Sequence, residues 1–137
     1  MSSTTQKYSR IDEPVKKAPS GNGARHRPNP VTGCPLTAAL AAIGGKWKLI
    51  IVYWLAESPK HFAALRQAIP DISQKVLTQQ LRELVSDGLV NRKPTGVIPA
   101  PVEYSLTEYG KSLLPLLENV RLWGTGHIEH LKGNVEL

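Results

Sequence analysis

One stretch, residues 72–90, restricts the folds open to this chain more than any other. Its sequence is ISQKVLTQQLRELVSDGLV, and both ends carry signals of a helix boundary. Ser73 can cap the N-terminus with its hydroxyl group. Gly88 can adopt the left-handed conformation that follows a helix, with Leu89 as the apolar contact of a Schellman-type cap. The stretch therefore predicts a single helix with two defined ends.

The residues of this predicted helix separate into two faces. The spacing i, i+4, i+7 and i+8 of a buried stripe is occupied by Leu77, Leu81, Leu84 and Val85. A second face carries Lys75, Thr78, Gln79 and Arg82. It is rich in hydrogen-bond donors that can reach base edges and phosphates in a DNA major groove. The alternative explanation is an ordinary solvated helix surface. The neighbouring segments distinguish a DNA-contacting face from a solvated one.

The segment before this helix has the form of a partner helix. Phe62, Leu65 and Ile69 lie on one side of a short helix predicted over residues 60–69, which Pro70 ends. A tight turn then leads into residues 72–90. Two short helices joined in this way, the second with a polar donor face, are typical of a helix-turn-helix.

The segment after it has the form of a β wing. Residues 89–93 and 102–106 are predicted strands, separated by a loop that contains three prolines. Arg92 and Lys93 stand at the base of this wing, where they can meet backbone phosphate. The predicted fold is therefore mainly α with a small antiparallel β wing, a winged helix-turn-helix.

Two further helices are predicted before this motif. Pro35 favours a first helical turn after Cys34, and Leu36, Leu40 and Ile43 give a short amphipathic helix that Gly44 and Gly45 stop. A second helix is predicted from Lys46 to Leu55. Its apolar residues surround it so widely that it must be buried, against the core or against a partner chain.

The C-terminal segment predicts helix-on-helix contact. A helix restarts at Thr107-Glu108, and the positions of a heptad seam are taken by Tyr109, Leu113, Leu116, Val120 and Trp123. Pro115 predicts a kink or a fresh start. The seam either covers its own domain or pairs two chains, and the small size of the domain favours a dimer. Gly124 and Gly126 predict a loosened end, with residues 127–137 frayed.

The charge of the chain is divided unevenly. The net charge of the 137 residues is +6, of which +4 lies in residues 1–33, +4 in residues 46–93 and −2 in residues 94–137. This distribution favours an anionic partner for the first two parts. Residues 1–33, rich in Pro and Gly, are predicted to be a flexible basic tail, which either adds phosphate contacts or only aids solubility.

Several classes of protein find no support. The polar start predicts no signal peptide, and the longest apolar run, residues 49–56, is too short to span a bilayer. One cysteine suits a reducing cytosol. We find no zinc-ligand spacing, nucleophile–base pair, paired carboxylates or phosphate-cradling glycine loop. We therefore expect a cytoplasmic protein that is not an enzyme and has no metal, cofactor or membrane partner.

Several motifs together resemble the HxlR-type bacterial transcriptional regulators, which are relatives of the MarR group. They are CPL at 34–36, IGGKWKLI at 43–50, ISQKVLTQQLREL at 72–84, DGLV at 87–90 and VEYSLTE at 102–108. The resemblance covers about residues 34–125 and is strongest in the two long runs. It implies a winged-helix homodimer that binds a palindromic operator.

Site residues follow from the resemblance position by position. Those that match the recognition helix of the family are Ser73, Gln74, Lys75, Thr78, Gln79 and Arg82. Lys46 and Lys48 match positions near the DNA backbone, and Cys34 matches a cysteine that senses oxidants or electrophiles in some members. The chain departs from the family at His61, Ala63-Ala64 and Pro101. Pro101 leaves the wing poorer in charge, so the helix contacts are the stronger expectation.

Single residues leave alternatives open. Cys34 precedes a helix N-terminus, which can lower the pKa of a thiol, but it is equally a small apolar core residue. Trp47, Tyr53 and Trp54 can line a ligand pocket, although aromatic residues at helical spacing more often form a core or a dimer interface. His61 can touch phosphate or simply be exposed.

These observations predict a domain over residues 34–126, followed by a frayed end at 127–137. The predicted function is that of a homodimeric transcriptional regulator, a repressor, on palindromic double-stranded DNA, controlled by a small molecule or by oxidation of Cys34. The predicted dimer interface consists of Leu36, Leu40, Leu113, Leu116, Val120 and Trp123. The alternative is a winged-helix protein-interaction module without specific DNA readout.

Overall fold

The computed structural model describes residues 33–96 and 101–135 of the chain. Most of the predicted tail, residues 1–32, and the tip of the wing loop, residues 97–100, lie outside this part. The chain divides into two units, residues 1–45 and 46–137, each of which is considered by itself.

The described part of the first unit is one helix, α2 (Pro35–Ile43), with Pro35 in its first turn. The N–H of Gly44 donates to Leu40 O at 2.7 Å, and Gly45 has a φ of 90°. A left-handed backbone favours glycine because it has no Cβ. The predicted helix and its glycine stop are therefore confirmed.

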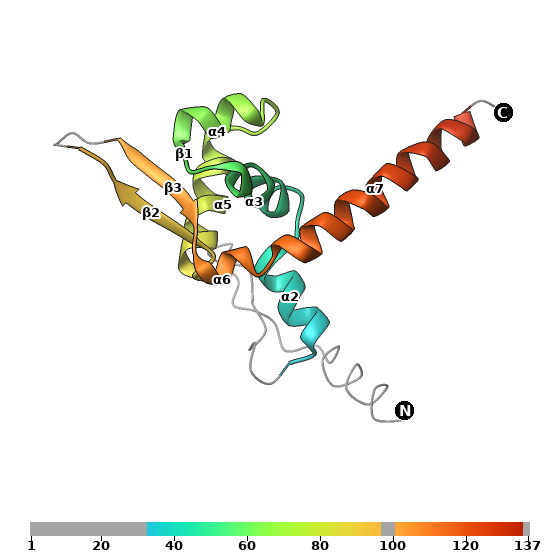
Figure 1. The fold of residues 1–137 in the computed structure, drawn as a ribbon, viewed down its shortest axis with the longest axis horizontal. Helices are drawn as coiled ribbons and strands as arrows, with labels where there is room; N and C mark the ends of the chain where they lie inside the picture. Colours follow the sequence, from blue (N-terminus) through green and yellow to red (C-terminus); the bar gives the residue numbers. More distant parts are fainter. Residues whose placement is uncertain (1–32, 97–100, 136–137) are drawn as a thin grey trace, which may run out of the picture. The chain divides into compact units, whose positions relative to one another are not determined.

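The second unit has the element order of a winged helix-turn-helix (Figure 1). Its elements are α3 (Lys48–Glu57), β1 (Lys60–His61), α4 (Phe62–Ala68), α5 (Gln74–Ser86), β2 (Val90–Pro94), β3 (Val102–Leu106), α6 (Glu108–Lys111) and α7 (Leu114–Val135). The predicted fold class is confirmed. α3 begins two residues later than predicted, after Trp47.

The sheet has three strands, not the two that were predicted. Its order is β1-β3-β2, and both neighbouring pairs are antiparallel. Lys60 and His61, predicted as the first turn of a helix, instead pair with Tyr104 and Glu103 of β3. The prediction failed here because two residues are too few to show strand periodicity, and their partner lies about forty positions further along the chain.

The core lies where α3, α4 and α5 meet the base of the sheet. Its most deeply buried side chains are Ile51, Val52, Leu65, Ile72, Leu77, Leu81 and Leu84. The predicted stripe of α5 is confirmed for its three leucines, whereas Val85 is only half-buried. Burying this stripe leaves the opposite face of α5 at the surface.

Both ends of α5 have the predicted caps. Ser73 Oγ accepts the N–H of Val76 at 3.1 Å. Gly88 has a φ of 77° and donates to Val85 O at 3.0 Å, while Leu89 donates to Leu84 O at 3.0 Å. These two bonds form the Schellman motif, and Leu89 is buried. The caps fix the length of α5 at thirteen residues.

Removing the N-terminal cap is expected to weaken the domain measurably. Ser73→Ala removes the acceptor of the Val76 N–H and should lower the free energy of unfolding by about 1 kcal/mol. Ser86→Ala, in the exposed last turn of the same helix, is the matched control and should change it by less than about 0.5 kcal/mol. Urea unfolding measures both values, and equal values would refute the capping role.

The C-terminal helices confirm one prediction and correct another. Thr107 caps α6, with Oγ1 accepting the N–H of Gly110 at 2.8 Å. The chain then turns at residues 112–113 and α7 begins at Leu114, so the predicted fresh start near Pro115 is confirmed. The predicted fraying from His127 is wrong, because α7 continues to Val135. A mid-helix glycine weakens a helix by only about 1 kcal/mol, which does not end it.

The part of the chain that the structure describes has no single helix long and apolar enough to cross a membrane. Only α2 and α3 taken together, as a broken pair, reach the required length and apolar composition.

Candidate nucleic-acid interface

The face of α5 opposite the core presents the predicted donor set. A surface hollow is lined by Gln74, Lys75, Thr78, Gln79 and Arg82. All are exposed except Thr78, which is half-buried. Ser73 differs from the rest because its oxygen already accepts the capping bond, which leaves only its hydroxyl proton for another partner. The structure thus brings five of the six recognition-helix residues into one continuous surface.

Lys48 is not part of this surface, and its predicted contact with the DNA backbone is wrong. It is the one charged residue among the buried polar side chains of the described chain, and 4% of it is exposed. Lys48 Nζ lies 2.6 Å from Glu83 Oε1 of α5. A lysine held inside by a carboxylate cannot reach phosphate. Lys48 sits on the inward side of α3, whereas the exposed Lys46 precedes that helix.

Glu83 also contacts the polar face of α5. Gln79 Nε2 donates to Glu83 Oε2 at 2.8 Å. The two oxygens of the carboxylate therefore have different partners, one in the core and one on the polar face. Glu83 was not among the site residues predicted from the sequence, although its position at i+4 from Gln79 is a spacing at which helical side chains meet.

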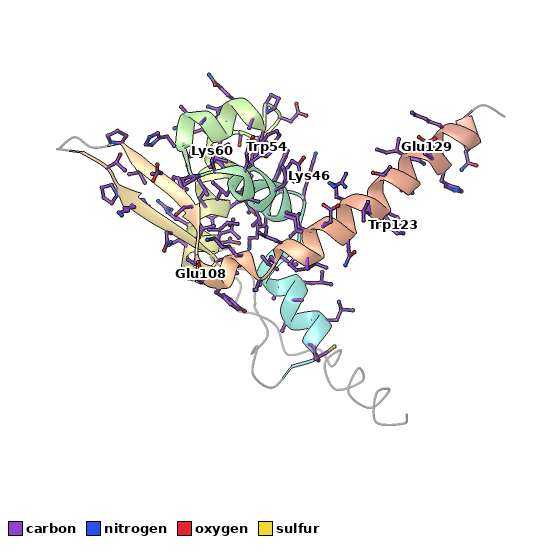
Figure 2. The ribbon with its side chains drawn as sticks, viewed as in Figure 1. Lys46, Trp54, Lys60, Glu108, Trp123 and Glu129 are labelled. Atoms are coloured by element: carbon purple, nitrogen blue, oxygen red, sulfur yellow. The ribbon has the colours of Figure 1, made fainter. Side chains whose placement is uncertain are left out.

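Lys46 remains available for phosphate. Its Nζ lies 4.6 Å from the centroid of the Trp47 ring, and the residue is exposed (Figure 2). A cation over an aromatic face is attracted by the ring quadrupole, which orders the side chain without neutralising its charge.

The strand register of the wing places its two basic residues, Arg92 and Lys93, on opposite faces of the sheet. Arg92 pairs with Tyr104, and Lys93 pairs with Glu103. Side chains directly opposite in an antiparallel pair share a face, and successive residues alternate faces. Tyr104 lines a second hollow with Gln74 and Thr78 of α5. The register therefore favours Arg92 over Lys93 as the wing residue on the side of α5.

His61 has a structural contact in the same region. Its Nδ1 lies 3.0 Å from Val102 O, within the β1–β3 pair. The ring is exposed and lines the hollow beside Tyr104. His61 therefore links the short first strand to the wing.

The predicted seam on α7 is largely exposed. The exposed fractions are 41% for Leu116, 45% for Val120 and 69% for Trp123, whereas Leu113 is half-buried. Figure 2 shows Trp123 on the part of α7 that extends away from the sheet. On α2, considered by itself, Leu36 and Leu40 are 60% and 57% exposed. Apolar side chains this exposed are typical of a surface that another chain covers.

Of the three aromatic residues that were predicted to line a pocket, Tyr53 and Trp54 line a groove between α3 and α7. Tyr53 and Trp54 form it together with Leu114, Leu117, Glu118 and Arg121. Trp47 is not among the lining residues. The Arg121 guanidinium donates to both oxygens of Glu118, at 3.0 and 2.7 Å. These bonds lower the pKa of Glu118, and Glu118 in turn raises the pKa of Arg121.

Cys34 immediately precedes α2 and is 6% exposed. Within the described residues, no cluster of three His, Cys, Asp or Glu side chains could hold a metal ion.

Comparison with known proteins identifies the family. The family model of the HxlR-like helix-turn-helix matches residues 42–132. The chain belongs to this family. Its members are helix-turn-helix transcriptional regulators, so this chain is a DNA-binding transcriptional regulator with a MarR-like winged helix.

Individual relatives agree with this assignment. The HTH-type transcriptional regulator YtcD of Bacillus subtilis is 45% identical over 97 residues, which cover 71% of this chain and 77% of YtcD. The redox regulator HypR in its reduced form has 41% identity and a TM-score of 0.69, with 73% of this chain and 99% of HypR covered. Reduced YodB of B. subtilis has 34% identity and a TM-score of 0.59, with coverage of 66% and 89%.

Proposed function

We propose that this regulator is a homodimer that binds a palindromic operator and represses transcription from it. The observation that carries the proposal is the polar face of α5, whose donors line one hollow at the surface. Arg, Lys, Gln and Thr are the side chains that pair with base edges in the major groove. The rest of α5 is anchored in the core, so this face is the one that can enter a groove.

The protein–DNA contacts in this proposal are of two kinds, to bases and to the phosphate backbone. Lys75, Thr78, Gln79 and Arg82 read bases, and Gln74 and Ser73 contact the backbone beside the helix N-terminus. Lys46 and Arg92 set the register through phosphates, with Lys93 as a weaker contributor. Lys48 takes no part.

Binding to a palindromic operator also sets the geometry that the dimer needs. Two recognition helices that enter successive major grooves must stand about 34 Å apart. The exposed apolar residues of α7 and of α2 are the surfaces that would hold the two chains at this spacing. Repression then requires only that the bound dimer cover a promoter.

The alternative, a module that binds an acidic protein, gives a different dependence on salt. A phosphate binder releases counterions, so its affinity for random duplex DNA falls steeply as salt rises. We expect Lys46→Ala to weaken binding to all duplexes about equally and to reduce the slope of log K against log salt by about 1. Fluorescence anisotropy with a labelled random duplex measures both. A flat slope for the wild-type protein would favour the alternative.

Control of binding is proposed to pass through Cys34. HypR is a redox regulator by name, and Cys34, the one cysteine of this chain, lies directly before the first turn of α2. Because the chain has one cysteine, any disulfide must join two chains or a chain and a small thiol. We expect diamide to change operator affinity in the wild type and not in Cys34→Ser. A slow thiol with unchanged binding would leave a small-molecule effector as the means of control.

A further inference from the structure

The chain of contacts from Lys48 through Glu83 to Gln79 joins the core to the proposed reading face. Glu83 Oε1 lies 2.6 Å from Lys48 Nζ, and Glu83 Oε2 accepts from Gln79 Nε2 at 2.8 Å. The side chains of Lys48 and Glu83 are 5% and 24% exposed. Lys48 is therefore fixed by its surroundings, and it fixes the carboxylate that Gln79 contacts.

This arrangement determines which way the amide of Gln79 points. A carboxylate accepts hydrogen bonds and donates none, so only the NH₂ end of the Gln79 amide can face Glu83. One Nε2 proton is used in that bond. The second Nε2 proton and the oxygen Oε1 remain for a partner outside the protein. Without Glu83, an amide could present either end, because rotating it by half a turn exchanges its oxygen and nitrogen.

We infer that Glu83 is a positioning residue that makes Gln79 select adenine. Adenine offers a donor at N6 and an acceptor at N7 in the major groove, which match the outward oxygen and the remaining proton of Gln79. Guanine offers acceptors at both O6 and N7, so its O6 would face the Gln79 oxygen. The inference rests on the proposed function, since it requires α5 to enter the major groove.

The first experiment locates the base pair that Gln79 reads. Duplexes enriched by the wild-type protein from a random pool are changed one position at a time, and affinities are measured for wild type and Gln79→Ala. At one position in each half-site, the wild type should prefer adenine over guanine by about 5- to 150-fold. Gln79→Ala should lose that preference and keep the others.

The second experiment tests Glu83 itself. The side chain in Glu83→Gln has the same shape, but Lys48 can only donate and therefore holds the new amide oxygen, which turns the NH₂ group toward Gln79. The Gln79 NH₂ group then has no acceptor at this position, and the orientation that favours adenine is no longer stabilised. The adenine preference at that position should fall by about tenfold. Glu108→Gln, which removes the same charge from an exposed pair with Lys111, is the matched control and should keep the preference.

A further variant separates positioning from folding. Glu83→Gln leaves Lys48 buried without its carboxylate, which destabilises a domain, whereas Lys48→Met/Glu83→Gln removes both charges. The double variant should unfold cooperatively and should also lose the adenine preference. A preserved adenine preference in this folded variant would overturn the inference, as would a base other than adenine at the position that depends on Gln79. If the wild type enriched no sequence at all, the proposed function would fail first.

Discussion

Gly110→Ala is expected to lower the free energy of unfolding by about 3 kcal/mol. Gly110 is buried in α6, and a Cβ atom at this position would meet the carbonyl oxygen of Leu89 well inside van der Waals contact. That carbonyl also accepts the N–H of Thr107 at 3.1 Å, and Thr107 Oγ1 donates to Gly88 O at 2.7 Å. The added Cβ would therefore clash with backbone that two hydrogen bonds from Thr107 hold in place. Overpacking against such backbone lowers the free energy of unfolding by at least the usual 1–3 kcal/mol.

The effect should reach beyond α6. Gly88 and Leu89 form the cap that ends α5, so displacing α6 disturbs the C-terminal end of the proposed recognition helix. Gly124→Ala is the matched control, because it lies in α7 and an added Cβ has no atom within 4 Å. Alanine is the better helix former, so this change should stabilise the protein by up to about 1 kcal/mol. Thermal unfolding compares Gly110→Ala with Gly124→Ala. Equal unfolding midpoints would contradict the close contact between Gly110 of α6 and the Leu89 carbonyl.

Lys48→Ala is expected to lower the free energy of unfolding by about 3 kcal/mol. It removes a buried ion pair with Glu83 at 2.6 Å and leaves the carboxylate without its cation. Breaking a buried pair by removing one partner typically costs 3–5 kcal/mol. We place the effect at the lower end, because Glu83 is 24% exposed and can recover some hydration.

Lys46→Ala provides the contrast within the same segment. Lys46 is exposed over Trp47, so its loss should change stability by only about 0.5 kcal/mol. Urea unfolding of the two variants side by side distinguishes the buried lysine from the exposed one. If Lys48→Ala unfolded at the same urea concentration as the wild type, the ion pair between Lys48 and Glu83 would not stabilise the domain.

The sequence predicted the fold where local signals were strong. The two caps of α5, its leucine stripe and the glycine stop of α2 depend on residues within a few positions of one another, and each was confirmed. The restart of the C-terminal helix followed from Pro115 in the same way. These features are set by backbone conformation and helical periodicity, which a sequence displays directly.

Predictions from the sequence failed mainly where the structure depends on contacts between residues far apart in the chain. β1 exists because Lys60 and His61 find Tyr104 and Glu103 across the sheet. Lys48 resembled Lys46 in the sequence, and only the packing of α3 on α5 separates a buried lysine from an exposed one. α7 continues past its glycines because, once begun, a helix tolerates them. The strand and the buried lysine therefore have no local signal, whereas the length of α7 was underestimated because the cost of its glycines was overestimated.

Selection of binding sites for the wild-type protein from a pool of random duplexes tests whether α5 reads bases. We expect one enriched inverted repeat whose half-sites lie about one helical turn, roughly 34 Å, apart on the duplex. An unenriched pool, with binding that depends on salt but not on sequence, would contradict the claim that the polar face of α5 reads bases.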